Sequence, residues 1–253
     1  MGSKIKIINT SGTRITKKPN PNQTNLTSDG SNVFIESTTI DKKIGAGNSV
    51  DSNLINTYNS SITESPYSTI IGGKYNYMYK TPQSSILGGR LNLISGNSYC
   101  NISYNSIVGG CRNEIINSDY ATVIGGYENC ILGYGGDYSA IIAGSKNKIE
   151  YQSQNSAILA GCSNVIQSNG SRVSYYSTIL GGRDNSIFNS SYSSILAGYN
   201  AKIFSDADSA DCSVIIAGNE NKIYNSNGST VFGGTSNKIE KNTQYSLILG
   251  GNK

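Results

Sequence analysis

The sequence predicts an all-β fold, a parallel β-solenoid (β-roll) of about eleven short coils. A phrase of two apolar residues followed by Gly-Gly or Ala-Gly occurs eleven times between residues 70 and 251, first as Ile70-Ile71-Gly72-Gly73. The second glycines of successive phrases lie 16 to 21 residues apart. A unit of that length cannot bury its own apolar side, so it must stack on its copies. Glycine pairs and β-branched residues at this spacing leave no room for the apolar stripe of a helix.

Every coil repeats residue types at fixed distances from the second glycine of its phrase, which we number position 0. Position −3 holds Ile or Val, and position −2 holds Ile, Leu, Val or Phe, in all eleven phrases. Position +3 holds Asn in nine of ten cases, and position +5 holds Met78 followed by nine isoleucines. Each coil is therefore expected to hold two short strands, such as 176–180 and 185–188. A tight Gly-Gly-x-x-Asn turn joins them, because Gly and Asn tolerate positive φ angles.

Parallel stacking would put every side chain over its equivalent in the next coil. The isoleucines at position +5 are then expected to form one interior column. The asparagines at position +3 are expected to form a ladder along one corner, in which identical stacked amides hydrogen-bond to each other.

The two adjacent apolar residues of the phrase must both be shielded from water, and they point to opposite faces because neighbouring residues of a strand do so. The strand therefore needs a buried surface on each side. If position −3 points into the coil, position −2 forms an outward apolar column. Such a column exceeds the apolar patch of a few hundred Å² that a soluble monomer tolerates, so we expect it to lie at the axis of a cyclic homo-oligomer, two-fold or three-fold. The alternative is an early turn that points both residues inward. The expected axis residues are Ile71, Leu87, Val108, Ile124, Ile142, Leu159, Leu180, Leu196, Ile216, Phe232 and Leu249.

The N-terminal region differs from the repeats in being polar and basic. We predict a basic extended attachment arm over residues 1–30, a neck of degenerate first coils over 31–65, and the solenoid shaft over 66–253. The concentrated charge favours an arm that orders against a capsid or tail protein, and a frayed tail is the alternative. The expected attachment residues are Lys4, Lys6, Arg14, Lys17 and Lys18.

The composition excludes several classes of function. The chain has no His, so a Ser-His-Asp triad is excluded. The net charge of +4 is concentrated in the arm, which leaves no basic stripe for nucleic acid. No apolar run is long enough for insertion into a membrane. The five cysteines form no C-x-x-C pair and are interpreted as small repeat-position residues. We expect no catalytic, cofactor-binding or metal-binding residue, and no enzyme.

Two possible arrangements of acidic residues are alternatives to a chain without a metal site or an enzymatic activity. Asp206, Asp208 and Asp211 share one loop, but they lack the glycine at the bend and the terminal glutamate of a calcium loop. A pair of carboxylates for glycoside cleavage stays open, because sugar-cutting tailspikes also use β-solenoids.

Position −6 holds tyrosine in seven of the eleven coils. Stacked tyrosines can hold the face of a sugar or a protein partner, which makes this column the candidate recognition surface. The alternative is that the rings cover the seam between coils or between chains. The column consists of Tyr67, Tyr104, Tyr120, Tyr138, Tyr176, Tyr192 and Tyr245.

The repeats resemble those of a known group of proteins. Residues 44–50 (Ile-Gly-Ala-Gly-Asn-Ser-Val) and 176–182 (Tyr-Ser-Thr-Ile-Leu-Gly-Gly) are similar to the head repeats of trimeric autotransporter adhesins, and equally to the Gly-Gly solenoid repeats of phage and viral fibres. The resemblance covers roughly residues 44–251 and implies three parallel β-rolls around one axis. The adhesin repeats are shorter and richer in Ala, and this chain shows no secretion signal, heptad stalk or membrane-anchor barrel, which favours the fibre.

From the repeats and the resemblance we expect a structural virion protein, a homotrimeric head or tail fibre at the virion surface. Its expected partners are its own copies, a capsid or tail protein bound through the arm, and a glycan or protein of the host surface. The alternatives are the head of a bacterial adhesin at the cell surface, and a glycan-degrading tailspike.

Overall fold

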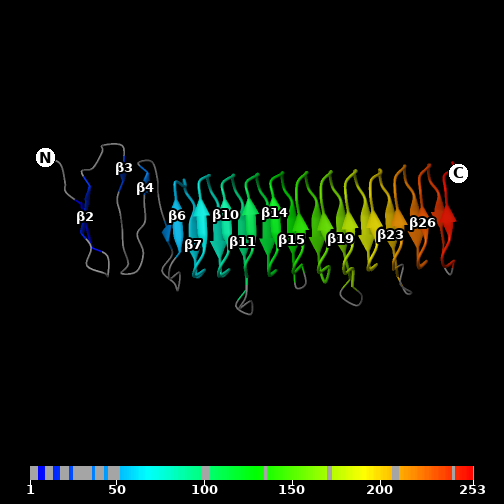
Figure 1. Ribbon diagram of the computed structural model, residues 1–253, viewed down its shortest axis with the longest axis horizontal. Coiled ribbons are helices and arrows are strands. Elements are labelled where there is room, and N and C mark those ends of the chain that lie inside the picture. The colour runs from blue at the N-terminus through cyan, green and yellow to red at the C-terminus, as the bar shows by residue number, and fades with distance from the viewer. Residues whose placement is uncertain are drawn as a thin grey trace. The chain divides into compact units, whose positions relative to one another are not determined.

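The computed structural model describes the backbone of five short N-terminal strands and, with side chains, residues 52–97, 103–133, 136–169, 173–206, 211–240 and 243–252. The regular structure in these ranges is β-strand throughout, with no helix (Figure 1). The chain divides into two compact units, residues 1–112 and 113–253, and each is described by itself.

The strands are short, two to four residues each. Unit 1 contains β1 (Ile5–Ile8), β2 (Arg14–Lys17), β3 (Gln23–Thr24), β4 (Glu36–Ser37), β5 (Lys43–Ile44), β6 (Asn53–Ile55), β7 (Ser61–Thr63), β8 (Thr69–Ile71), β9 (Tyr77–Tyr79), β10 (Ser85–Leu87), β11 (Leu93–Ser95) and β12 (Ser106–Val108). Unit 2 contains β13 (Glu114–Ile116), β14 (Thr122–Ile124), β15 (Cys130–Leu132), β16 (Ala140–Ile141), β17 (Lys148–Glu150), β18 (Ala157–Ile158), β19 (Val165–Gln167), β20 (Thr178–Ile179), β21 (Ser186–Phe188), β22 (Ser194–Ile195), β23 (Lys202–Phe204), β24 (Val214–Ile215), β25 (Lys222–Tyr224), β26 (Thr230–Val231), β27 (Lys238–Ile239) and β28 (Leu247–Ile248).

From β5 onward, the strands pair in parallel with their copies in the neighbouring coils. The even-numbered strands from β6 onward form what we call the phrase sheet of each unit, and those from β8 onward carry apolar residues of the phrase. The odd-numbered strands from β5 onward form the opposite sheet. The register matches equivalent residues, as in Ile86 with Ile107 of unit 1 and Ile187 with Ile203 of unit 2. The predicted all-β parallel solenoid of about eleven coils is confirmed.

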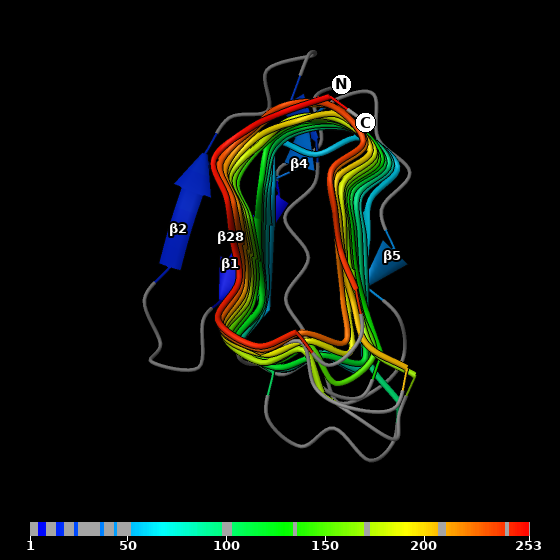
Figure 2. The same cartoon turned by 90° about the vertical axis from the view of Figure 1, so that its right-hand side faces the viewer.

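The core of each unit is a double column of branched side chains. Position −3 of the phrase sheet and position +5 of the opposite sheet both point into the coil, and Ile179 and Ile187, for example, are 0% exposed. Viewed along the stack, the coils of unit 2 superpose as a flattened ring whose long sides carry the two sheets (Figure 2). The interior isoleucine column predicted at position +5 is therefore present, and position −3 supplies its counterpart across the core.

Coil-like strand pairing begins inside the predicted neck of degenerate first coils. Strands β6 and β7, inside the predicted neck, pair in parallel with β8 and β9 in the same register as later coils. Strand β5 pairs in the same way with β7. Closer to the N-terminus, β1 pairs antiparallel with β2, and β3 with β4.

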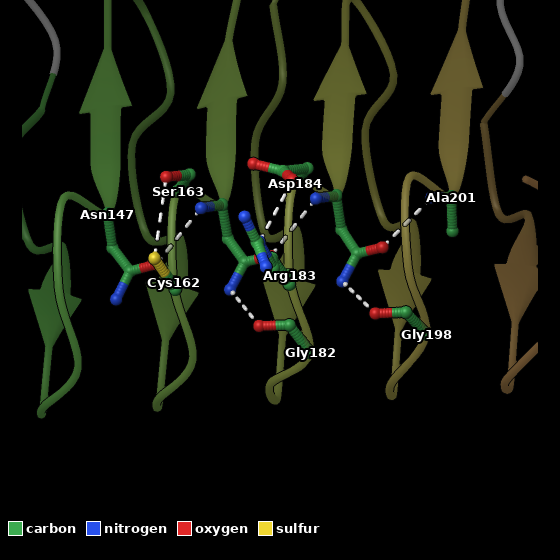
Figure 3. A network of polar contacts seen from close by, with 10 residues as sticks. Asn147, Cys162, Ser163, Gly182, Arg183, Asp184, Gly198 and Ala201 are labelled. Atoms are coloured by element: carbon green, nitrogen blue, oxygen red, sulfur yellow. Dashed lines mark hydrogen bonds and ion pairs between the residues drawn. The ribbon is translucent and has the colours of Figure 1, made fainter. Parts of the chain in front are cut away.

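The asparagine column lies along one corner as predicted, but its amides bond mainly to backbone rather than to one another. The Asn147 Oδ1 atom accepts the backbone N–H of Asn164 at 3.0 Å, and its Nδ2 group donates to the carbonyl of Gly161 at 3.1 Å. Figure 3 shows this arrangement from Asn147 to Ala201, the residue that replaces Asn at position +3 in one coil. An amide-to-amide bond does occur at Asn237, which donates to Asn221 Oδ1 at 3.2 Å.

A second polar ladder, of serines at position −5, follows another corner. The Ser177 hydroxyl accepts the backbone N–H of Ser193 at 3.3 Å and donates to the carbonyl of Ser190 at 2.8 Å. Both ladders satisfy backbone groups that the short strands leave unpaired, and a buried backbone group without a partner is costly. The buried polar side chains of the two ladders therefore stabilise the fold by bonding to backbone groups.

Candidate functional site

The outer face of the phrase sheet carries an exposed apolar column at position −2. In unit 1, Val108 is 38% exposed, and in unit 2, Phe232 is 49% exposed, whereas their neighbours at position −3 are fully buried. The alternative in which both phrase residues point inward is wrong. The column includes the exposed Ile71, Leu87, Val108, Ile124, Ile142, Leu180, Phe232 and Leu249 and the half-buried Leu159, Leu196 and Ile216.

The rest of this face is small and uncharged. Position −4 lies on the same face, two residues before the apolar column, and its side chains are mostly half-buried. It holds Thr69, Ser85, Ser106, Thr122, Ala140, Ala157, Thr178, Ser194, Val214, Thr230 and Leu247. No charged residue stands at position −4 or −2 in any coil. The corresponding face of the opposite sheet carries Lys148, Glu150, Lys202, Lys222 and other charged residues, so the two outer faces differ in kind.

The phrase ends in a corner where the backbones of neighbouring coils approach closely. At Gly181 and Gly233, first glycines of the phrase without a left-handed φ, a Cβ atom would meet no atom within 4 Å, which explains why alanine is tolerated at this position in four coils. At most of the second glycines, such as Gly144 and Gly182, a Cβ atom would overlap the carbonyl of the next coil's glycine and the asparagine amide at position +3. The second glycine is therefore invariant among the eleven phrases for a steric reason.

The tyrosines of position −6 lie at corners and are all exposed. Their backbones adopt left-handed φ angles, from +46° at Tyr104 to +59° at Tyr67, a conformation that strains a bulky residue. Tyr176 and Tyr192 stack with ring centroids 5.1 Å apart, so these rings cover the seam between adjacent coils. In unit 2 the column is interrupted by Asn155, Cys212 and Gly228.

The side chains of the predicted attachment residues lie outside the described part of the structure. Lys4 and Lys18 lie outside the described residues, and only the backbone is described for Lys6 in β1 and for Arg14 and Lys17 in β2.

The acidic loop at 206–211 uses its described carboxylates within the fold. Asp206 accepts hydrogen bonds from the Tyr224 hydroxyl and the Asn225 amide. Asp211 Oδ1 accepts the backbone N–H of Ser191 at 2.7 Å, and Asp208 lies outside the described residues. Within the described ranges, no group of three or more His, Cys, Asp or Glu residues is placed to hold a metal ion.

The carboxyl group of Asp119 has a raised pKa. Burial, and secondarily the charge of Asp137, raises the pKa of Asp119 to about 6. Asp137 Oδ1 accepts the backbone N–H of Asp119 at 2.8 Å, and Asp137 Oδ2 accepts a hydrogen bond from Gln154 Nε2 at 3.2 Å. The Asp137 carboxylate therefore links the coil before it to the coil after it. The Asp119 Oδ1 atom is buried without a hydrogen-bond partner.

The raised pKa of Asp119 predicts that the free energy of unfolding depends on pH. Because folding raises the pKa of Asp119, its stabilising contribution is complete below the usual pKa near 3.8 and is lost as the pH rises through about 6. We expect Asp119→Asn to leave stability unchanged at pH 4 and to raise the free energy of unfolding by about 1 kcal/mol at pH 7, a value discounted for solvent screening at a partly exposed site. Urea unfolding at both pH values measures the difference. An equal effect at the two pH values would contradict this assignment.

The described cysteines are all free thiols, namely Cys111, Cys130, Cys162 and Cys212, and Cys100 lies outside the described residues. Burial raises the pKa of Cys130 to about 12, and its Sγ lies 3.7 Å from Glu114 Oε2. Cys130 therefore remains a neutral thiol at physiological pH.

Comparison with known proteins finds no family model that matches the chain, and no curated protein with significant similarity to it. Within the described ranges, no helix is long and apolar enough to cross a membrane.

Proposed function

We propose that this chain is a structural fibre protein that assembles as a homotrimer through the outer face of its phrase sheet. In this proposal its N-terminal arm binds a virion, and the solenoid projects toward the host surface. The observation that carries it is the exposed apolar column at position −2, on a face that has no charged residue in any coil. A face of this kind is typical of a permanent interface between subunits.

Cyclic symmetry around an axis parallel to the stack fits the regularity of the face. Rotation about such an axis keeps each coil at the same height in every copy, so Leu180 of one copy would meet the Leu180 side chains of the others. Each coil then repeats the contact of its neighbours, because the same small residue types recur at position −4. The resemblance to adhesin heads and viral fibres favours three copies over two.

The use of polar residues inside the coil supports a structural role. The repeated Asn and Ser side chains bond to the backbone of neighbouring coils, as at Asn147 and Ser177. A partner must therefore be recognised by the outer faces and corners rather than by a polar interior. An oligomer that covers one outer face leaves the other free for contact with a surface.

The assembly is tested by sedimentation equilibrium of the full chain at micromolar concentration. We expect three times the chain mass of 26.9 kDa. A single well-behaved chain would overturn the proposal, and a dimer would overturn its three-fold symmetry.

The arm is tested by deletion. We expect a variant lacking residues 1–30 to keep its β-rich circular dichroism spectrum and its oligomeric state, because the strands from β5 onward pair with one another and not with β1 to β3. It should no longer co-sediment with particles of the virus or phage that carries the protein. Retained particle binding by the deletion variant would assign attachment to another part of the chain.

A further inference from the structure

The outer face of the opposite sheet carries a groove in the later coils of unit 2. Strands β23 and β25 each place a lysine and an aromatic residue on this face, on either side of an inward isoleucine. The groove has a volume of 310 Å³. It is lined by Lys202, Phe204, Lys222, Ile223, Tyr224 and Lys238.

The lysines of this groove form a column of like charge. Lys202 pairs in register with Lys222, and Lys222 with Lys238, so successive ammonium groups start from backbones only about 4.8 Å apart. Like charges directly opposite each other destabilise a sheet. Lys238 forms an ion pair with Glu240, whereas in the described part of the chain neither Lys202 nor Lys222 has a carboxylate at ion-pairing distance.

Earlier coils of unit 2 show the usual way of avoiding such a column. Lys148 occupies the same position +4, and Glu150 at position +6 of the same strand lies 3.5 Å from its Nζ atom. In β23 and β25, position +6 holds Phe204 and Tyr224 instead of a carboxylate. Among the described lysines at position +4, those without a carboxylate partner are therefore Lys202 and Lys222, which both line the groove.

The aromatic wall of the groove presents ring edges. The ring of Phe204 stacks on Phe188 at 5.2 Å and on Tyr224 at 5.1 Å between centroids, so both of its faces are covered. The edge of an aromatic ring is the positive end of its quadrupole. The wall therefore adds to the attraction of anionic oxygen atoms, and it leaves no free face of Phe204 on which a nucleic-acid base can stack.

We propose that this groove binds an acidic polysaccharide, a sulfated or carboxylated glycan chain that lies along the stack. Its anionic groups would contact Lys202, Lys222 and Lys238 in turn, and a polymer gains from several such contacts at once. The inference gives a ligand class to the surface contact proposed above and rests on that proposal for its biological role. The groove lies on the sheet opposite to the apolar face, so assembly through that face would leave it open.

The test measures binding of a fluorescent heparin fragment to the full chain at about 0.1 M salt. We expect Lys202→Gln with Lys222→Gln to weaken binding at least about tenfold, since two charge-assisted contacts are lost. The matched control Lys148→Gln, at the same position with a carboxylate beside it, should bind as tightly as the unchanged chain. Unchanged affinity of the double variant would overturn the proposal.

Two further probes decide the chemistry of the ligand. Neutral dextran should not bind, and a single-stranded thymidine oligonucleotide of equal charge should bind more weakly than heparin. Equal binding of dextran or of the oligonucleotide would overturn an acidic-glycan site, the latter in favour of nucleic acid. Sedimentation of the double variant should still show the full oligomer, so loss of glycan binding is distinguished from failure of assembly.

Discussion

Gly161→Ala should lower the free energy of unfolding by about 3 to 5 kcal/mol, because it breaks the contact between two coils. Gly161 has φ +95°, and a Cβ atom built there would overlap the Gly182 carbonyl and lie 2.5 Å from Asn164 Nδ2. The left-handed backbone costs an L-residue about 1–2 kcal/mol. Moving the amide also breaks its bond to Gly182, 3.2 Å long, and leaves buried polar groups unpaired.

The neighbouring phrase supplies a matched control for this effect. Gly181 is a first glycine, a Cβ atom there would meet nothing within 4 Å, and alanine stands at this position in other coils. Gly181→Ala should change stability by less than about 0.5 kcal/mol. Urea unfolding of both variants at one protein concentration makes the comparison. Similar midpoints for the two variants would show that the asparagine corner does not determine how closely the coils approach.

The sequence was sufficient to predict the interior of the coil because strand geometry has a period of two. Once Ile179 was assigned to the inside, Leu180 had to face outward, and the exposed fractions of both residues agree. The side-chain columns could be predicted by aligning the coils on the second glycine. This alignment holds although the coils differ in length, because the extra residues lie between strands rather than within them.

The partners of the asparagine ladder were predicted less well, for a physical reason. A corner between two-residue and three-residue strands leaves backbone N–H and carbonyl groups without ladder partners, and these groups must be satisfied. The amide of Asn147 therefore bonds to the backbone of Asn164 and Gly161 instead of to its stacked equivalent. Fibre-like amide ladders require backbone that is already fully paired in a continuous strand.

Two features of the coils were missed although the alignment of the repeats contained them. The serine at position −5 was hidden by the high serine content of the whole chain, and only its bonds, such as Ser177 to Ser193, distinguish it. The lysine column at position +4 spans only the later coils, so it gives no repeat-wide signal. It becomes a site only when register places Lys202 beside Lys222 and Phe204 beside Tyr224.

Leu180→Lys should separate the proposed oligomer into single chains. Leu180 is 42% exposed in the single chain and lies in the apolar column of unit 2. Under cyclic symmetry one substitution puts a lysine from every copy at the same height near the axis. Each buried and unpaired charge costs several kcal/mol, and the like charges also repel. We expect assembly to weaken at least a hundredfold, measured by sedimentation across a concentration series.

The same coil offers a control that adds an identical charge to the other sheet. Ser186 lies on the outer face of β21, at position +4, where β23, β25 and β27 carry lysine. Ser186→Lys should leave the oligomer intact, because that face takes no part in the proposed interface. Dissociation by both lysines would indicate a general effect of charge, and dissociation by Ser186→Lys alone would place the interface on the opposite sheet. Only loss of assembly confined to Leu180→Lys agrees with an axis lined by the residues of position −2.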